Sequence, residues 1–285
     1  MLFACLVLGG CGPSRAQRIV VGSKNFSEQL VLGELLAQQV ESKTHLPVDR
    51  RFYLSGTFIC QQAMLAGRID LYPEYTGTAL TAVLKHTPQG SARDVYDRVK
   101  SEYAERFRLE VGPPLGFDDT FAIEIRGEDA RRLHLQSISQ AAAYTSEWRP
   151  GFGYEFMERP DGYKGLVATY GLRFAAPPRI MDLGLLNRAL KDRQVDLIAG
   201  NTTDGIIDAF DFFVLADDRH YFPPYQAVPI VREETLRLHP ELRAALSELK
   251  NRISEDEMRK LNYAVDGEHR DPAVVIREFR RRKGL

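Results

Sequence analysis

The segment at residues 70–78, Asp-Leu-Tyr-Pro-Glu-Tyr-Thr-Gly-Thr, most constrains how this chain can fold. The residues before it are apolar at helical spacing up to Gly67, which predicts a helix that ends at a glycine. A short buried strand follows, and residues 79–84 then begin a second helix, with Thr76 or Thr78 as its expected N-cap. The tyrosines of the segment therefore lie where a strand ends and a helix begins, and ligands bind at such positions in open α/β sheets.

Residues 192–205 repeat this pattern later in the chain. Asp70 aligns with Asp196, and both precede a short apolar run. In that register Tyr75 falls on Asn201. The repeat predicts that two halves of the molecule each present a strand end to one shared cleft.

Length and composition indicate a soluble globular chain. Its 285 residues can form two domains, and its 44% apolar and 27% charged residues are ordinary values. The net charge is −1, so no overall field attracts nucleic acid or an acidic membrane. We expect no nucleic-acid partner and no membrane span beyond Arg18, so contact with a membrane would occur only through a lipid anchor.

The N-terminal segment begins with apolar residues, continues with small ones and then reaches Cys11. Residues 1–12 resemble the end of a secretory signal with a lipoprotein cleavage site before Cys11, which predicts lipidation of Cys11. A basic stretch is missing there, which places the expected start upstream, and the alternative is a buried N-terminal strand or helix. We expect residues 1–18 to be leader and linker, and the protein to be periplasmic or on the outer face of the cell membrane. Cys60 would then be a lone, buried, small apolar residue.

Lys24 follows a predicted strand at residues 19–21 and precedes a helix for which Ser27 is the expected N-cap. A lysine at this position is either solvated or, where the strand end faces a cleft, holds an anionic group. Composition alone favours the solvated interpretation.

Three further strands are predicted at residues 48–53, 121–125 and 227–231. Arg159 precedes a Pro-Asp-Gly turn, which indicates a position near the surface or a cleft. Two prolines precede Tyr225 and fix the backbone there, so its ring is held in one place.

Signals for catalysis are weak. The chain has no Gly-x-Ser-x-Gly, His-Glu-x-x-His or Walker sequence, and its six histidines lack metal-ligand spacing, so we predict no metal and no cofactor. Asp118 and Asp119 are adjacent, so in a strand they would point to opposite faces. Aromatic rings at rigid loops and a few cationic residues favour a binding protein, and the alternative is a secreted enzyme that uses Asp119 or Glu74 as a base.

Six blocks in chain order resemble the substrate-binding proteins of osmoprotectant ABC importers, which take up glycine betaine, choline, carnitine and proline betaine. The blocks lie at residues 22–29, 70–78, 115–117, 159–163, 203–205 and 222–225. The resemblance implies an α/β, two-lobed periplasmic-binding-protein fold of type II, with two crossover strands as the hinge. It implies a partner ABC permease with its ATPase.

The same resemblance divides the chain into lobes. Lobe 1 would comprise residues 19–121, with residues 226–285 returning to it, and lobe 2 residues 122–225. The predicted strands at residues 121–125 and 227–231 lie where the crossovers should be. Closure of the lobes would bury the ligand.

The resemblance also implies a binding site. Ring faces hold a quaternary ammonium because it has no N–H to donate. The walls of the cage fall on Tyr75, Phe121, Asn201 and Tyr225, the residues for a ligand carboxylate on Lys24, Thr78 and Arg159, and a residue at the ammonium end on Asp119.

Two walls depart from the family pattern. Phe121 lacks the hydroxyl of a tyrosine, and Asn201 lacks a ring. A missing ring face predicts weaker betaine binding by roughly 1–2 kcal/mol, hence modest affinity. The alternative is that Asn201 hydrogen-bonds another zwitterion, such as an amino acid or ergothioneine, with Asn201 and Arg159 as the specificity pair.

Overall fold

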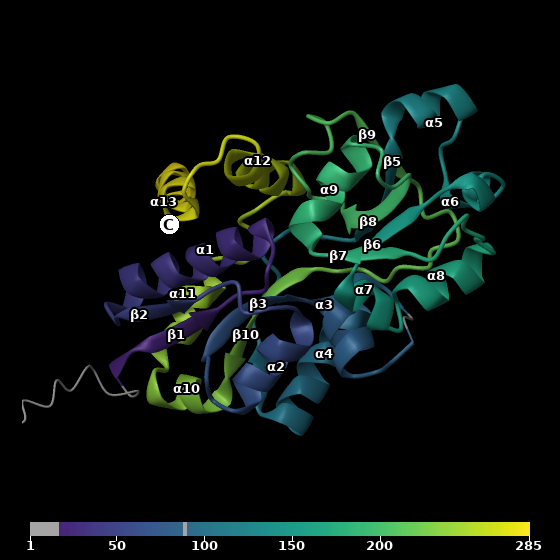
Figure 1. Cartoon of the computed structure of the whole chain (residues 1–285). Helices are drawn as coiled ribbons and strands as arrows, with labels where there is room; N and C mark the ends of the chain where they lie inside the picture. Colours follow the sequence, from purple (N-terminus) through teal and green to yellow (C-terminus); the bar gives the residue numbers. More distant parts are fainter. Residues whose placement is uncertain (1–16, 88–89) are drawn as a thin grey trace, which may run out of the picture.

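The computed structural model describes residues 17–87 and 90–285 and contains two five-stranded sheets (Figure 1). The first sheet has the order β2 (Val48–Arg51), β1 (Ile19–Gly22), β3 (Leu71–Tyr75), β10 (Ala227–Arg232) and β4 (Leu109–Val111). The second has the order β7 (Arg179–Met181), β6 (Pro150–Gly153), β8 (Leu197–Asn201), β5 (Phe121–Arg126) and β9 (Phe212–Leu215). The predictions for Cys11 and the leader fall on residues 1–16, outside the described part.

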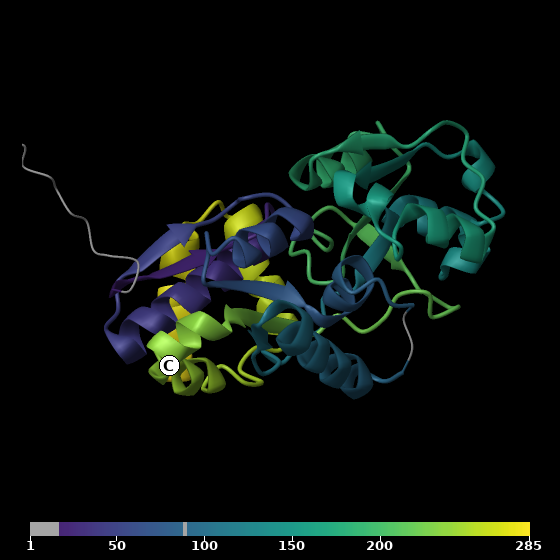
Figure 2. The same ribbon diagram turned by 90° about the horizontal axis from the view of Figure 1, so that it is seen from below.

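The two sheets share one pairing pattern. In each, three strands run parallel and the fourth and fifth are antiparallel to their neighbours. β8 of the second sheet therefore occupies the place that β3 has in the first. Figure 2 shows the two groups of elements side by side, with both ends of the described chain in one group and its middle in the other.

Helices bury both faces of the first sheet. Val21 packs into the core shared with α1 (Ser27–Thr44), while Val20 points to the opposite face, where α2 (Thr57–Leu65) and α4 (Ala92–Phe107) lie. Further helices follow β10 and are α10 (Glu233–Leu238), α11 (Glu241–Ser247), α12 (Glu255–Asp266) and α13 (Pro272–Lys283). Helix α1 packs against the last three of them (Figure 1).

The second sheet carries shorter helices. They are α5 (Gly127–Leu133), α6 (Ile138–Ala141), α7 (Tyr154–Glu158), α8 (Tyr163–Tyr170) and α9 (Leu183–Lys191). Leu186 and Leu190 of α9 pack on Ile198 of β8, because the apolar residues of α9 fall on one face.

The chain passes between the sheets next to β5 and β10, as predicted. Residues 112–120 lead from β4 into β5, and residues 216–226 lead from β9 into β10. The two passing segments contact each other, since Asp118 and Gln226 form an isolated antiparallel bridge. The starts of β5 and β10 therefore lie close together.

None of the predicted N-cap side chains makes a capping hydrogen bond, although Thr78 does stand at the N-cap of the helical residues 79–83. Helix α1 has Phe26 at its N-cap, and the Ser27 hydroxyl donates to Asp266 of α12 instead. The helix after β3 begins at Thr76 itself, as α3 (Thr76–Thr78) continued by the π-helix η2 (Ala79–Val83). In both places a tertiary partner takes the hydroxyl: Thr76 Oγ1 accepts from Gln226 N at 3.1 Å.

The second predicted strand is shorter than expected, and the environment of Cys60 agrees with the prediction. The strand predicted at residues 48–53 ends at Arg51, because Tyr53 has φ of +59° and leaves the extended conformation. Cys60 is fully buried and unpaired, as predicted, and burial raises the pKa of its thiol to about 12.

Candidate functional site

A cavity of about 210 Å³ lies between the two groups of elements. All eight predicted site residues line it: Lys24, Tyr75, Thr78, Asp119, Phe121, Arg159, Asn201 and Tyr225. Most of them stand where a strand ends or begins, at the edge where the chain passes between the sheets. One side of the cavity is thus formed from the first sheet and the other from the second.

Tyr75 and Asn201 occupy equivalent places. Tyr75 is the last residue of β3 and pairs with Ala227 of β10, whereas Asn201 is the last residue of β8 and pairs with Phe121 of β5. The two strand ends face one cleft, as the internal repeat predicts. The copies diverge afterwards, because a helix follows Tyr75 and turns follow Asn201.

Lys24 is buried, with 4% of its surface exposed, so the solvated interpretation is wrong. Its ammonium donates to Glu74 Oε1, and Glu74 is fully buried. The Tyr72 hydroxyl donates to the other oxygen of Glu74 at 3.1 Å. Lys24 Nζ also lies 4.9 Å from the centroid of the Tyr75 ring, a cation–π distance.

Arg159 forms the corresponding arrangement on the second side. Its Nε and Nη2 donate to the two oxygens of Asp161 at 2.9 and 2.5 Å, and the Tyr225 hydroxyl donates to the same carboxylate at 2.5 Å. Burial alone raises the pKa of Asp161, but the Arg159 guanidinium outweighs it and holds that pKa below its usual value. Arg159 Nη1 reaches across to Thr78 Oγ1 at 3.1 Å and so connects the two sides.

Aromatic rings gather around these cations. Phe121 meets Tyr225 edge to face, with centroids 5.7 Å apart, and the Arg159 guanidinium lies 4.8 Å from the Phe121 centroid. Gly77 permits the position of Tyr225: a Cβ there would lie 2.6 Å from the ring. This contact accounts for the glycine in Thr-Gly-Thr.

A carboxyl network lies next to the cavity. Thr203 Oγ1 is 2.6 Å from Glu28 Oε2 and 2.7 Å from Asp119 Oδ1, and the Tyr75 hydroxyl donates to Glu28 Oε1 at 2.7 Å. The Thr203 hydroxyl carries one proton and can donate it to only one of the two acids. A hydrogen bond with the other acid therefore requires a proton on that acid. Burial is the main cause that raises the pKa of Glu28 and of Asp119.

Sequence reasoning missed three contributors to the site. Phe26 lines the cavity and stacks near Tyr75, with centroids 6.4 Å apart, and its only signal was its place beside Lys24 in the loop. Asp161 lies within the Arg-Pro-Asp-Gly block, but nothing there indicates its partners. Glu155 accepts from Phe58 N at 3.2 Å and thereby joins α7 to the start of α2, a contact that no sequence pattern marks.

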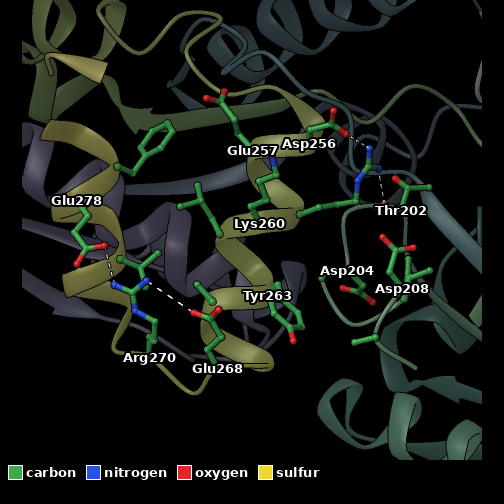
Figure 3. Close-up of a pocket in the computed structure, with 18 of the residues that line it drawn as sticks. Thr202, Asp204, Asp208, Asp256, Glu257, Lys260, Tyr263, Glu268, Arg270 and Glu278 are labelled. Carbon is green, nitrogen blue, oxygen red and sulfur yellow. Dashed lines mark hydrogen bonds and ion pairs between the residues drawn. The ribbon is translucent and has the colours of Figure 1, made fainter. Parts of the chain in front are cut away.

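A second, more open pocket of about 1040 Å³ is lined by Thr202, Asp204 and Asp208, which follow β8 (Figure 3). Thr202 and Asp204 line it on one side, and α12 and α13 form the other. Some of its charged residues are paired with one another, as Arg270 is with Glu278 and Arg259 with Asp256. The segment after β8 thus separates the two hollows.

Neither a metal site nor a membrane helix is found in the described part of the chain. Residues 17–87 and 90–285 contain no cluster of three or more His, Cys, Asp or Glu arranged to hold a metal ion. No helix within the same residues has the length and apolar content to cross a bilayer.

Comparison with known proteins gives one family. Residues 17–282 match the substrate binding domain of ABC-type glycine betaine transport systems. The carnitine transport binding protein OpuCC of Listeria monocytogenes is 34% identical over 276 residues, which cover 95% of this chain and 89% of that protein. The ergothioneine transport permease and binding protein EgtU of Helicobacter pylori is 34% identical over 94% of this chain, but the match spans 48% of that longer protein.

Solved structures agree on the fold. The crystal structure of a glycine betaine/carnitine/choline ABC transporter protein superposes with a TM-score of 0.76 at 32% identity, covering 93% of this chain and 98% of the other. The predicted fold class, α/β with two lobes, is confirmed by this match and by the two sheets.

Proposed function

Because this chain belongs to the family of substrate-binding domains of ABC-type glycine betaine transport systems, we propose that it captures a quaternary-ammonium osmoprotectant outside the cytoplasm and delivers it to an ABC permease. The observation that carries the proposal is the convergence of three rings and two cations on one cavity. The family consists of transport substrate-binding proteins and is not an enzyme family.

The rings suit the ammonium end of such a ligand. A trimethylammonium group cannot donate a hydrogen bond, so ring faces must hold it, at about 0.5–2 kcal/mol each. Tyr75, Phe121 and Tyr225 offer faces or edges to the cavity, and Asp119 adds a carboxyl. Asn201 stands where a fourth ring would complete the cage, which supports modest affinity for glycine betaine.

The cations suit the carboxylate end. Lys24 and Arg159 line the cavity together with Thr78, which already accepts a hydrogen bond from Arg159. A carboxylate placed there would share charge-assisted hydrogen bonds with these groups. The proposal assigns ligand contact to all eight predicted residues.

Lobe motion follows from the same scheme. In this proposal residues 19–121 and 226–285 form lobe 1, residues 122–225 form lobe 2, and closure buries the ligand. The partner would be a permease with its ATPase, and the protein would act in the periplasm or on the outer face of the cell membrane. Mass spectrometry of the cell-derived protein, which would detect a lipid on Cys11, tests the proposed anchor.

Calorimetric titration of the purified protein tests the function. We expect glycine betaine, carnitine or choline to bind, and Tyr75→Ala and Tyr225→Ala to weaken that binding by at least about tenfold each, since each removes a ring face. Tyr144→Ala, at an exposed tyrosine outside the cavity, is the matched control and should leave affinity unchanged. Failure of all three ligands at millimolar concentration would contradict the proposal.

A second candidate is another zwitterion, such as ergothioneine or an amino acid. It is supported by Asn201, whose carboxamide lines the cavity where a ring would favour betaines, and by the similarity to the ergothioneine-binding relative. This candidate is favoured if ergothioneine binds more tightly than the trimethylammonium ligands that lack the ring system of ergothioneine.

A further inference from the structure

Both cations of the cavity already have anionic partners inside the protein. Lys24 is paired with Glu74, and Arg159 with Asp161, and the exposed fraction of each of the four side chains is at most 6%. Each carboxylate also accepts a tyrosine hydroxyl, from Tyr72 or from Tyr225. A ligand therefore meets cations whose charge is largely neutralised by these internal pairs.

The arrangement around Arg159 leaves few of its donors free. Nε and Nη2 bond Asp161, and Nη1 bonds Thr78. A ligand carboxylate must therefore share the guanidinium with Asp161, whereas a ligand without a carboxylate leaves every one of these bonds intact. Two buried anions on one cation also repel each other.

Two other acids of the cavity also disfavour a ligand that carries a carboxylate. Glu155 and Asp182 line it, and no lysine or arginine in the described residues forms an ion pair with either. These two acids therefore weaken the attraction of Lys24 and Arg159 for a ligand carboxylate.

We propose that Asp161 is a specificity-determining positioning residue, which holds Arg159 and Tyr225 in place and reduces the preference of the site for quaternary-ammonium ligands that carry a carboxylate. This inference rests on the proposed function. It assigns to Asp161 the balance between cationic and zwitterionic trimethylammonium ligands.

The test compares glycine betaine with choline, because both carry a trimethylammonium group and only glycine betaine carries a carboxylate. Asp161→Asn preserves the shape of the side chain and removes its charge, so Arg159 becomes free to pair with a ligand carboxylate. We expect the ratio of glycine betaine affinity to choline affinity to rise by about tenfold or more, as one charge pair in a largely dry site implies. Asp161→Glu keeps the charge and should keep the ratio near that of the unmodified protein.

Controls separate specificity from folding. Asp211→Asn removes the same group from an exposed ion pair with Arg131 and should leave the ratio unchanged. If Asp161→Asn does not fold, Glu74→Gln applies the same test to Lys24 and should shift the ratio in the same direction.

Two outcomes overturn the inference. An unchanged ratio, with both affinities falling in parallel, would make Asp161 merely structural. A ratio that moves toward choline would reverse its assigned effect. Failure of the unmodified protein to bind either ligand would instead contradict the proposed function, so the two failures are distinguishable.

Discussion

Leaving aside Glu155 and Asp182, the carboxyl groups around the cavity fall into two sets that differ in whether a cation faces them. In the cation-paired set, each acid contacts Lys24 or Arg159; its members are Glu74 and Asp161. In the cation-free set, no lysine or arginine of the described residues forms an ion pair with the acids; its members are Glu28, Asp119, Glu124 and Asp204.

Burial acts on both sets, but the result is opposite. For Asp161, burial raises the pKa and the Arg159 guanidinium reverses the shift, so the carboxyl stays ionised. For Asp119, burial and the nearby Glu28 both raise the pKa. Glu124 shows the extreme case, because neither of its oxygens has a hydrogen-bond partner among the described residues. The difference teaches that a facing cation can reverse the effect of burial on the pKa of a carboxyl beside the cavity.

Removing Arg159 should turn Asp161 into an acid of the cation-free set and should change the free energy of unfolding more than any other substitution considered below. Arg159→Met keeps an apolar side chain of similar length and leaves Asp161 buried without its partner. We expect the free energy of unfolding, measured in urea, to fall by about 3–5 kcal/mol, the cost of breaking a buried ion pair. Ligand binding should be lost as well.

The double variant Arg159→Met/Asp161→Asn provides the control for this prediction. It removes both charges, so most of the stability should return while ligand binding does not. A single variant as stable as the unmodified protein would show that the pair does not distinguish the two sets.

The pH dependence of stability should separate the sets by sign. Burial raises the pKa of Asp204 to about 7 in the folded protein. The folded state therefore binds one more proton than the unfolded state between the ordinary pKa of an aspartate and about pH 7, and this contribution to stability is lost as the pH rises through that range. Relative to Asp204→Asn, the unmodified protein should lose at most about 1.4 kcal/mol per pH unit, because Asp204 is only partly buried and solvent in the second pocket screens it.

Asp161 gives the opposite expectation. Its pKa is lowered in the folded state, so its contribution is present above the ordinary value and is lost only as the pH falls through the lowered one. The stability difference between Asp161→Asn and the unmodified protein should then be flat from pH 5 to 8. Urea unfolding at pH 5, 6, 7 and 8 measures both differences, and equal slopes would refute the division into two sets.

The partner of Glu155 is neither a cation nor another acid but a backbone N–H at the start of a helix. Its carboxylate accepts from Phe58 N and lies against Gly56, where a Cβ would stand 2.2 Å from Oε1. The atoms that a Cβ would meet are the far end of a flexible side chain, so Gly56→Ala should turn the Glu155 carboxylate away from Phe58 N and lower ligand affinity by about threefold, while the stability of the chain changes little. Glu155→Ala removes the same hydrogen bond and should lower affinity to a similar extent; unchanged affinity in both variants would exclude this contact from closure.

Most residues that line the cavity could be predicted from the sequence, but the groups that pair with the cavity cations could not. The eight predicted residues stand in short blocks whose residue types and order are visible along the chain, and the strand ends at Tyr75 and Asn201 follow from local patterns. Asp161 lies only two residues from Arg159, but other partners are distant: Glu74 is 50 residues from Lys24, and Thr203 is 175 residues from Glu28. Such contacts depend on how the sheets pack, and so the burial of Lys24 and the bonding of Ser27 could not be predicted from neighbouring residues.

Another small effect is expected from the ring that is missing beside the cation-free set. Asn201 ends β8, two residues before Thr203, which bridges Glu28 and Asp119, so a ring at this position would face the acids that have no cation. Asn201→Tyr should strengthen binding of glycine betaine and of choline equally, by about 1 kcal/mol, since the added face acts on the trimethylammonium group that both ligands share. Calorimetry with both ligands measures the change, and Leu185→Tyr, at an exposed position of α9 outside the cavity lining, is the control. A gain for glycine betaine alone would place the ring near the carboxylate and therefore near the cation-paired set, and no gain for either ligand would favour a hydrogen-bonding role for Asn201 toward another zwitterion.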